Sequence, residues 1–216
     1  MRSIQRESAV SITAVARAGT PLDIPRNGTI YRQSERADAV YYVERGLVRI
    51  DVASAEGKHA VVALLGPGSF LGECSLAGQE RRKASASALL DTRLIGIAKV
   101  DMLRLLRSDP SFARHFMTYL VRRVARVEED VADLQLNSIE KRLARALLLL
   151  ADIGGQGQGQ EQAALAAINQ QTLAEIVGTT RPRISHFLGK FRREGYVSGR
   201  GPLRVHSTLV NVLLRS

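Results

Sequence analysis

Residues 173–185 read Leu-Ala-Glu-Ile-Val-Gly-Thr-Thr-Arg-Pro-Arg-Ile-Ser, and this stretch decides the fold of the last third of the chain. Its apolar residues recur at helical spacing up to Gly178, and a second apolar series begins after the glycine. The pattern predicts a short helix over residues 170–177, a turn over 178–180 and a longer helix over about 181–194. A short helix, a tight glycine turn and a longer basic helix are typical of a helix-turn-helix, whose second helix lies in the major groove of DNA.

The second of these helices presents a basic face. Arg181 and Arg183 are predicted base or phosphate readers, because a guanidinium can donate two parallel hydrogen bonds to guanine. Ser185 and His186 are predicted to lie beside base edges, and Thr180 to cap the helix and contact a phosphate. The alternative is a solvated basic face on a helix that only packs. The predicted DNA-contacting residues are Thr180, Arg181, Arg183, Ser185, His186, Lys190 and Arg200.

Residues 196–206 follow this helix and predict a tight hairpin, which completes a winged helix-turn-helix with Arg200 and Arg204 near the DNA backbone. The charge of the chain favours the same partner. The net charge is +10, and from Ser138 onward eleven Lys and Arg residues stand against five Asp and Glu residues. Because each phosphate neutralised by Lys or Arg releases counterions, such an excess favours a polyanionic partner.

A long helix is predicted ahead of this domain. Asp109 followed by Pro110 is a start signal, and a new helix capped by Asn137 or Ser138 follows it. Apolar residues between them are spaced by three and four, which is the pattern of a two-stranded dimer helix. The alternative is an ordinary core helix that lies on the preceding domain. The predicted dimer interface consists of Met117, Leu120, Val124, Val127, Val131 and Leu134.

Residues 21–97 contain short alternating or β-branched runs separated by glycines, which predicts a β-sandwich or jelly roll. The expected strands are 40–43, 47–52, 60–65, 84–89 and 93–97. The fold class is therefore α+β. The expected domains are a β-roll with a leading helix over residues 1–108, a dimerisation helix over 109–136 and the winged helix-turn-helix over 137–216.

Three segments together resemble the Crp/Fnr family of bacterial transcription regulators, over nearly the full chain. They are residues 66–76, Gly-Pro-Gly-Ser-Phe-Leu-Gly-Glu-Cys-Ser-Leu, followed by Arg82; the long helix that runs into a capped helix; and residues 173–185. The resemblance implies a β-roll sensor, a dimer helix and a DNA reader in that order. It also implies a cytoplasmic homodimer whose partners are double-stranded DNA and RNA polymerase.

In members of this family that bind cyclic nucleotides, the resemblance assigns the cyclic phosphate to Arg82 and the ribose hydroxyl to Glu73. Two departures stand against cyclic AMP: Lys83 replaces the usual Ser or Thr, and Val127 with Glu128 replaces the hydroxyl pair that contacts adenine. Cyclic AMP, another small ligand and ligand-independent action all stay open, as does a structural salt bridge between Glu73 and Arg82. The candidate effector-binding residues are Gly72, Glu73, Cys74, Arg82, Lys83, Val127 and Glu128.

The reader also departs from the common family pattern. Pro182 and His186 stand where members that read the widespread half-site carry Glu and Arg. Proline cannot accept a hydrogen bond from cytosine. We therefore expect a two-fold symmetric operator, with half-sites about one helical turn apart, that differs from the widespread one.

Several other functions are disfavoured. Cys74 is the only cysteine, so one subunit cannot form a disulfide or a cysteine-ligated cluster, and we expect it to be a small buried thiol. The four histidines are scattered, which disfavours haem, and neither a metal site nor a membrane span is expected. Ser185 and His186 point about 100° apart on a helix, so catalysis is not expected. The remaining alternative is a nucleotide-responsive adaptor whose C-terminal domain binds protein instead of DNA.

Overall fold

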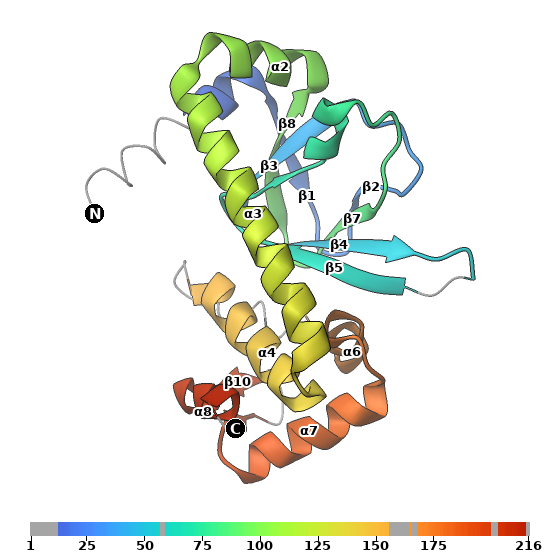
Figure 1. The fold of residues 1–216 in the computed structure, drawn as a ribbon, viewed down its shortest axis with the longest axis vertical. Coiled ribbons are helices and arrows are strands. Elements are labelled where there is room, and N and C mark those ends of the chain that lie inside the picture. Colours follow the sequence, from blue (N-terminus) through green and yellow to red (C-terminus); the bar gives the residue numbers. More distant parts are fainter. Residues whose placement is uncertain (1–12, 57–58, 156–164, 166–167, 200–202, 215–216) are drawn as a thin grey trace. The chain divides into compact units, whose positions relative to one another are not determined.

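The computed structural model describes residues 13–56, 59–155, 165, 168–199 and 203–214 (Figure 1). The described residues divide into two compact units. One lies within Met1–Ile50 and Leu64–Glu129, and the other within Asp51–Ala63 and Asp130–Ser216. Of the predicted leading helix, residues 13–18 are helical, and its earlier part lies outside the described residues.

The N-terminal part contains two four-stranded sheets. The first has the order β1-β8-β3-β6 and the second the order β2-β7-β4-β5. The strands are β1 (Thr20–Ile24), β2 (Thr29–Tyr31), β3 (Ala39–Arg45), β4 (Val48–Ala53), β5 (His59–Leu65), β6 (Phe70–Leu71), β7 (Ser85–Ala88) and β8 (Thr92–Ala98). All five predicted strands are present, within two residues at each end. The sequence reading missed β1, β2 and β6, because two of them are very short and β1 carries a proline.

Alternation along β3 and β8 separates the two faces of the first sheet. Val40 and Tyr42 of β3, with Ile95 and Ile97 of β8, belong to one buried cluster. Because successive side chains on a strand point to opposite faces, the residues between them face the second sheet. The cluster also contains Val15, Phe70, Met102, Phe112 and Phe116, so helices cover this face of the sheet.

Phe70 is the centre of this core. Its ring packs against Tyr42 and Phe116, each at a centroid distance of 5.0 Å, and against Tyr119 at 5.3 Å. Fully burying a phenylalanine contributes about 1.5–3 kcal/mol to stability. The carbonyl of Phe70 also accepts hydrogen bonds from the hydroxyl of Tyr119 at 2.7 Å and from Nη1 of Arg123 at 3.0 Å. The motif at 66–76 is therefore fastened to the following long helix by packing and by hydrogen bonds.

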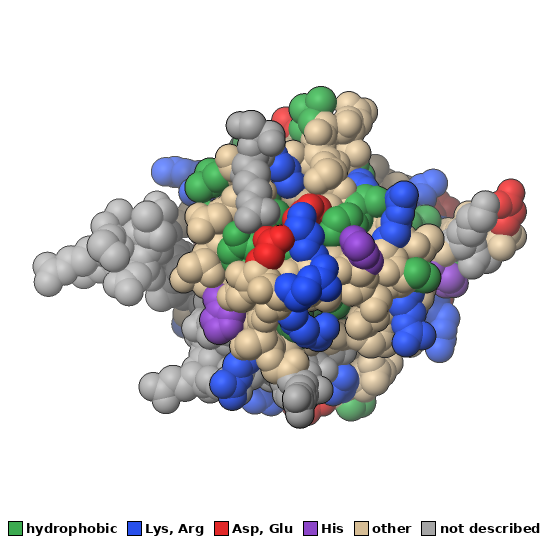
Figure 2. All heavy atoms as spheres, turned by 90° about the horizontal axis from the view of Figure 1, so that it is seen from below, with side chains coloured by type: hydrophobic (Ala, Val, Ile, Leu, Met, Phe, Trp, Pro, Cys, Tyr) green, Lys and Arg blue, Asp and Glu red, His purple; other side chains and the backbone are tan. Residues whose placement is uncertain are grey.

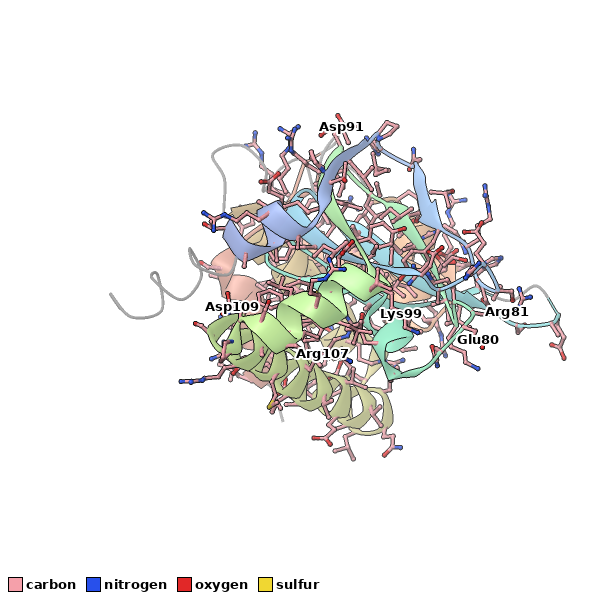
Figure 3. All side chains as sticks on the ribbon, turned by 90° about the horizontal axis from the view of Figure 1, so that it is seen from above. Glu80, Arg81, Asp91, Lys99, Arg107 and Asp109 are labelled. Atoms are coloured by element: carbon pink, nitrogen blue, oxygen red, sulfur yellow. The ribbon has the colours of Figure 1, made fainter. Side chains whose placement is uncertain are left out.

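Two helices follow the sheets. Helix α2 (Lys99–Ser108), which the sequence reading did not predict, has Lys99 at its start and Arg107 near its end (Figure 3). Helix α3 (Pro110–Leu136) begins where it was predicted to. Oδ1 of Asp109 accepts hydrogen bonds from the amides of Ser111 at 3.0 Å and Phe112 at 2.9 Å, as expected of a capping carboxylate.

Helix α3 carries an exposed apolar stripe. Met117 is 65% exposed, and Val124, Val127, Val131 and Leu134 are exposed in the same way. Leu120, which was also predicted to lie in the dimer interface, is partly buried against the core of its own β-roll. Exposed Val121, which the prediction did not include, lies beside the stripe.

The C-terminal part consists of helices α4 (Ile139–Gly155), α6 (Gln170–Val177), α7 (Arg181–Arg193) and α8 (Val210–Leu214), with a two-stranded sheet of β9 (Val197–Ser198) and β10 (Arg204–Val205). Short 3-10 helices η1 (Glu73–Ala77) and η2 (Ser207–Leu209) complete the described elements. The hydroxyl of Ser138 caps α4 by accepting a hydrogen bond from the amide of Lys141 at 3.3 Å. Buried residues of α4, including Leu143, Leu147 and Leu150, form a core that α6, α7 and α8 complete.

Candidate functional site

Local chemistry sets the angle between α6 and α7. Oδ1 of Asn169 caps α6 by accepting a hydrogen bond from the amide of Thr172 at 2.8 Å. Gly178 ends α6 with a φ of 69°, a left-handed conformation that glycine adopts at little cost. The amide of Thr179 closes the turn by donating to the carbonyl of Ala174 at 2.9 Å. The predicted helix-turn-helix is therefore present, and α6 has the predicted bounds.

Helix α7 has one buried and one exposed face. Ile184, Leu188 and Phe191 are buried, and at about 100° per residue the opposite side contains His186 and Arg193. The exposed residues of α7 include Arg181, Pro182, Arg183, Ser185, His186, Arg192 and Arg193. In the view from below in Figure 2, Lys and Arg side chains gather near the middle of the molecular surface, with histidines beside them.

The start of α7 is suited to anions. Thr180 occupies the N-cap position in an extended conformation, but its side chain makes no capping hydrogen bond. The predicted cap is therefore present in position only, and the hydroxyl is not used to cap α7. With Arg181 and Arg183 in the first turn, this end combines the positive end of the helix dipole with two guanidinium groups.

Lys190 differs from the other predicted DNA-contacting residues. Its Nζ donates a hydrogen bond to Oε2 of Glu140 at 3.0 Å and lies 3.9 Å from Oε1 of Glu194. The side chain is about one-third exposed, so its charge is partly matched within the domain. Of the wing residues, Arg204 is exposed on β10, and Arg200 lies outside the described residues.

A second group of residues gathers in the β-roll around Arg82. Strand β2 pairs antiparallel with β7, with Tyr31 opposite Ala86. The pairing continues beyond β2, where the amide of Ser34 donates to the carbonyl of Arg82 and the amide of Arg82 donates to the carbonyl of Glu35, both at 2.8 Å. This register brings Tyr31 next to Arg82, although 50 residues separate them in the chain.

Arg82 is only 6% exposed. Its Nη2 donates a hydrogen bond to the carbonyl of Ala39 at 2.8 Å, and its Nη1 donates a longer one to the carbonyl of Gly72 at 3.4 Å. The guanidinium carbon lies 4.3 Å from the ring centroid of Tyr31 and 5.7 Å from that of Tyr41. Its Nε is buried and has no hydrogen-bond partner. This guanidinium is therefore enclosed by backbone carbonyls and aromatic rings.

Gly72 makes this arrangement sterically possible. Its φ is 81°, and a Cβ atom at this position would collide with Nη1 of Arg82 and lie 2.9 Å from the carbonyl oxygen of Ala39. The group that comes close to the backbone at Gly72 is therefore the guanidinium of Arg82.

Glu73 pairs with a residue of the long helix. Its Oε1 lies 3.4 Å from Nη1 of Arg123, which also donates a hydrogen bond to the hydroxyl of Tyr119 at 3.1 Å. Burial would lower the pKa of Arg123, but the Glu73 carboxylate, Tyr119 and Tyr31 together more than offset this effect, and the pKa is raised. The alternative of a structural salt bridge between Glu73 and Arg82 is therefore wrong in its partner, because the ion pair joins Glu73 to α3.

The remaining candidate effector residues are exposed. Lys83 is exposed next to buried Arg82, and Val127 and Glu128 are exposed on α3. The expectation of a buried thiol at Cys74 is wrong, because this residue is exposed at the start of η1. Partial burial of the sulfur and the adjacent Glu73 carboxylate nevertheless raise the pKa of Cys74 above its ordinary value.

Sequence reasoning missed Tyr31, Tyr41 and Arg123 as members of the β-roll group. No sequence signal links Tyr31 to Arg82, since their contact depends on strand register. Arg123 lies on the predicted dimer helix, and its distance of seven residues from Phe116 places both on one helical face. That spacing was the available signal for a residue that contacts the β-roll.

Two further findings concern the described part of the chain. It holds no group of three or more His, Cys, Asp or Glu side chains arranged to bind a metal ion. Among the helices that are described, none has the length and hydropathy of a membrane span.

Comparisons with known proteins match most of the chain. A model of the cyclic nucleotide-binding domain matches residues 21–109, and a model of the Crp-like helix-turn-helix domain matches residues 141–208. Over 173 residues the chain is 34% identical to the cyclic AMP receptor protein of Thermus thermophilus, covering 80% of this chain and 77% of that protein.

Two more comparisons match most of the chain. A CRP-like cAMP-activated global transcriptional regulator of Mycobacterium tuberculosis is 25% identical over 187 residues, which cover 87% of this chain and 84% of that protein. Among solved structures, the c-di-GMP responsive global regulator CLP of Xanthomonas campestris matches with a TM-score of 0.74 and 22% identity, covering 91% of this chain and 98% of that one. At this identity the last comparison concerns the fold alone.

Proposed function

The chain belongs to the Crp/Fnr family of transcription regulators, and we propose that it acts as a homodimer on a two-fold symmetric DNA operator. The observation that carries the proposal is the exposed face of α7, where Arg181, Arg183, Ser185 and His186 are all accessible. A helix with this composition fits the major groove, and its N-terminal turn is suited to phosphates and base edges.

We assign different roles to the residues of this face. Arg181 and Arg183 read bases or grip phosphates, His186 and Ser185 lie beside base edges, and Thr180 contacts a phosphate. Arg200 belongs to the wing and contacts the backbone. Since the Lys190 amine is already paired with Glu140, we expect it to contribute less than the arginines.

The exposed stripe on α3 supports the homodimer. Met117, Val124, Val131 and Leu134 follow an a/d heptad pattern and are exposed in the single chain. Exposed apolar residues at this spacing are what a two-stranded coiled coil buries. Pairing through α3 gives each dimer two recognition helices, and hence half-sites about one helical turn apart on DNA.

The β-roll supplies a candidate effector site of the cyclic-nucleotide-binding type. Arg82 and Glu73 are the residues that would hold a cyclic phosphate and a ribose hydroxyl, and Gly72 provides the close backbone approach. A relative of this chain is named a cyclic AMP receptor protein. An effector at this site, a contact with RNA polymerase and a cytoplasmic location are parts of the proposal.

The experiment that tests the proposal is selection of palindromic duplexes from a randomised pool by the purified protein, followed by fluorescence anisotropy with the selected operator. Selective binding that weakens steeply between 50 and 200 mM salt, at about one dimer per duplex, is expected of a reader that makes several phosphate contacts. Binding that does not distinguish the operator from a scrambled duplex of equal length at any salt concentration would remove the proposal.

A protein-binding adaptor is not favoured, because a Crp-like helix-turn-helix model matches residues 141–208. The same experiment separates the two functions. A protein-binding surface of mixed charge depends on salt less steeply than a phosphate-binding one and does not select a duplex sequence.

A further inference from the structure

The enclosure of Arg82 has consequences for any anion that would bind there. A guanidinium binds a phosphate through N–H groups at its edge. Two of the edge nitrogens already donate to the carbonyls of Ala39 and Gly72, and Nε is buried. With 6% of the residue exposed, an anion can reach this guanidinium only if a neighbouring group moves away.

The groups that enclose Arg82 differ in their freedom to move. The two carbonyls belong to the backbone at the start of β3 and at Gly72, where pairing between β3 and β6 fixes the chain. Tyr31 and Tyr41 contact the guanidinium through side chains, and Tyr31 is the nearer of the two, with only 8% of the residue exposed. The ring of Tyr31 is therefore the nearest enclosing group that can move by changing rotamer.

We propose that Tyr31 controls access to this site, because its ring closes the anion subsite over Arg82 and makes binding of a cyclic mononucleotide weak. The inference rests on the proposed effector site. A ligand must displace the ring before its phosphate reaches Arg82, so its apparent affinity falls by the fraction of molecules in which the site is open.

Two properties of Tyr31 keep the site closed. A guanidinium stacked on a buried aromatic ring gains more than one stacked in water, so the closed arrangement is favoured. Burial of the hydroxyl, with Arg82 opposing the effect, raises the pKa of Tyr31 well above its ordinary value, and the ring therefore stays neutral at physiological pH. A neutral ring adds no negative charge that would repel an incoming phosphate, so the block is steric.

The Nε of Arg82, which has no hydrogen-bond partner, should favour anion binding once the Tyr31 ring has moved away. A buried donor without a partner is costly, and a phosphate oxygen that enters when Tyr31 leaves can accept its hydrogen bond. Removing the ring should therefore lead to gain of binding. Such a gain is diagnostic, since damage to the fold produces loss.

The test is isothermal titration calorimetry with cyclic AMP on the full chain. The opening variants are Tyr31→Val and Tyr31→Ile, two β-branched residues suited to a strand. Tyr31→Phe is the matched control, because it keeps the ring over Arg82. The double variant Tyr31→Val with Arg82→Ala asks whether any gained affinity depends on the guanidinium.

We expect both opening variants to bind cyclic AMP at least about tenfold more tightly than the unmodified chain. Tyr31→Phe should match the unmodified chain, and the double variant should lose the gain. The inference is overturned if the opening variants bind equally, more weakly or not at all. Selective operator binding without nucleotide is measured on the same samples. A failure of the proposed DNA-binding function is therefore distinguished from a failure of the inference that Tyr31 blocks access to Arg82.

Discussion

Removal of the Arg181 side chain is the most direct test of DNA binding by α7. Arg181 is exposed in the first turn of α7, and the buried face of that helix begins at Ile184. Replacement by alanine should therefore change the free energy of unfolding by no more than about 0.5 kcal/mol. Any larger effect of Arg181→Ala on DNA affinity can then be attributed to the interface.

The expected loss of affinity follows from the chemistry of one contact. A bidentate arginine–guanine contact contributes about 1–3 kcal/mol of discrimination. A symmetric dimer loses it twice, which gives about 2–6 kcal/mol, or a loss between about 30-fold and about 10⁴-fold in operator affinity. Binding to a scrambled duplex should change far less if Arg181 reads a base.

Fluorescence anisotropy at several salt concentrations separates the two roles of Arg181. If Arg181 grips a phosphate, affinity for all duplexes falls and the slope of log K against log salt becomes shallower by about two, one unit per subunit. Arg107→Ala, which removes the same charge from exposed helix α2, is the control and should keep operator selectivity. If Arg181→Ala changes the affinity for both duplexes by less than about threefold and leaves the slope of log K against log salt unchanged, Arg181 does not lie at the DNA interface.

Three further predictions concern the rest of the chain. Gly72→Ala should lower the free energy of unfolding by about 1–3 kcal/mol more than Gly68→Ala in urea titrations, because both glycines have positive φ but only Gly72 would collide with its surroundings; equal losses would contradict this. Val131→Glu should convert the proposed dimer to a monomer in sedimentation experiments, whereas Val100→Glu, on a valine of α2 that is even more exposed, should leave it dimeric. Burial, with the Glu73 carboxylate next, raises the pKa of Cys74, so iodoacetamide should modify folded protein at pH 8 more slowly than protein unfolded in urea; equal rates would count against this explanation.

The helix-turn-helix of α6 and α7 was predictable from the sequence because the residues that determine it are close together in the chain. Asn169 caps α6 within three residues, and Gly178 supplies the left-handed turn directly after the helix. Apolar residues spaced by three and four select the buried face of α7 without help from distant segments. Sequence patterns carry this kind of information well, and the bounds of α6 agree with the prediction.

The long helix was predictable in position but not in every contact. Its heptad spacing places Leu120 on the dimer stripe, yet this side chain packs against the core that surrounds Phe70. Phe70 is fifty residues away in the chain, and its neighbours are fixed by strand pairing. A heptad pattern therefore cannot say which of its residues are used inside the subunit.

The effector site was the least predictable part. The motif around Gly72 and Glu73 indicated where Arg82 should lie, but not that Tyr31 and Tyr41 would enclose it. The pairing of Glu73 with Arg82, one of the alternatives left open, is not the one formed, because Arg123 approaches Glu73 from α3. These contacts depend on the register of β2 against β7 and on helix docking, neither of which leaves a local signal.

Helix α3 connects the two proposed activities because its two faces have different partners. Phe112, Phe116, Tyr119 and Arg123 recur every three or four residues and contact Phe70, its carbonyl or Glu73. The exposed stripe from Met117 to Leu134 lies on an adjacent side of the helix, and we propose that it meets a second subunit. In the proposed dimer, a shift of the 66–76 segment would act directly on the helix whose exposed stripe sets the spacing of the two α7 helices. Communication between effector and DNA then requires only a small rotation or translation of α3, and no continuous chain of contacts through the reader.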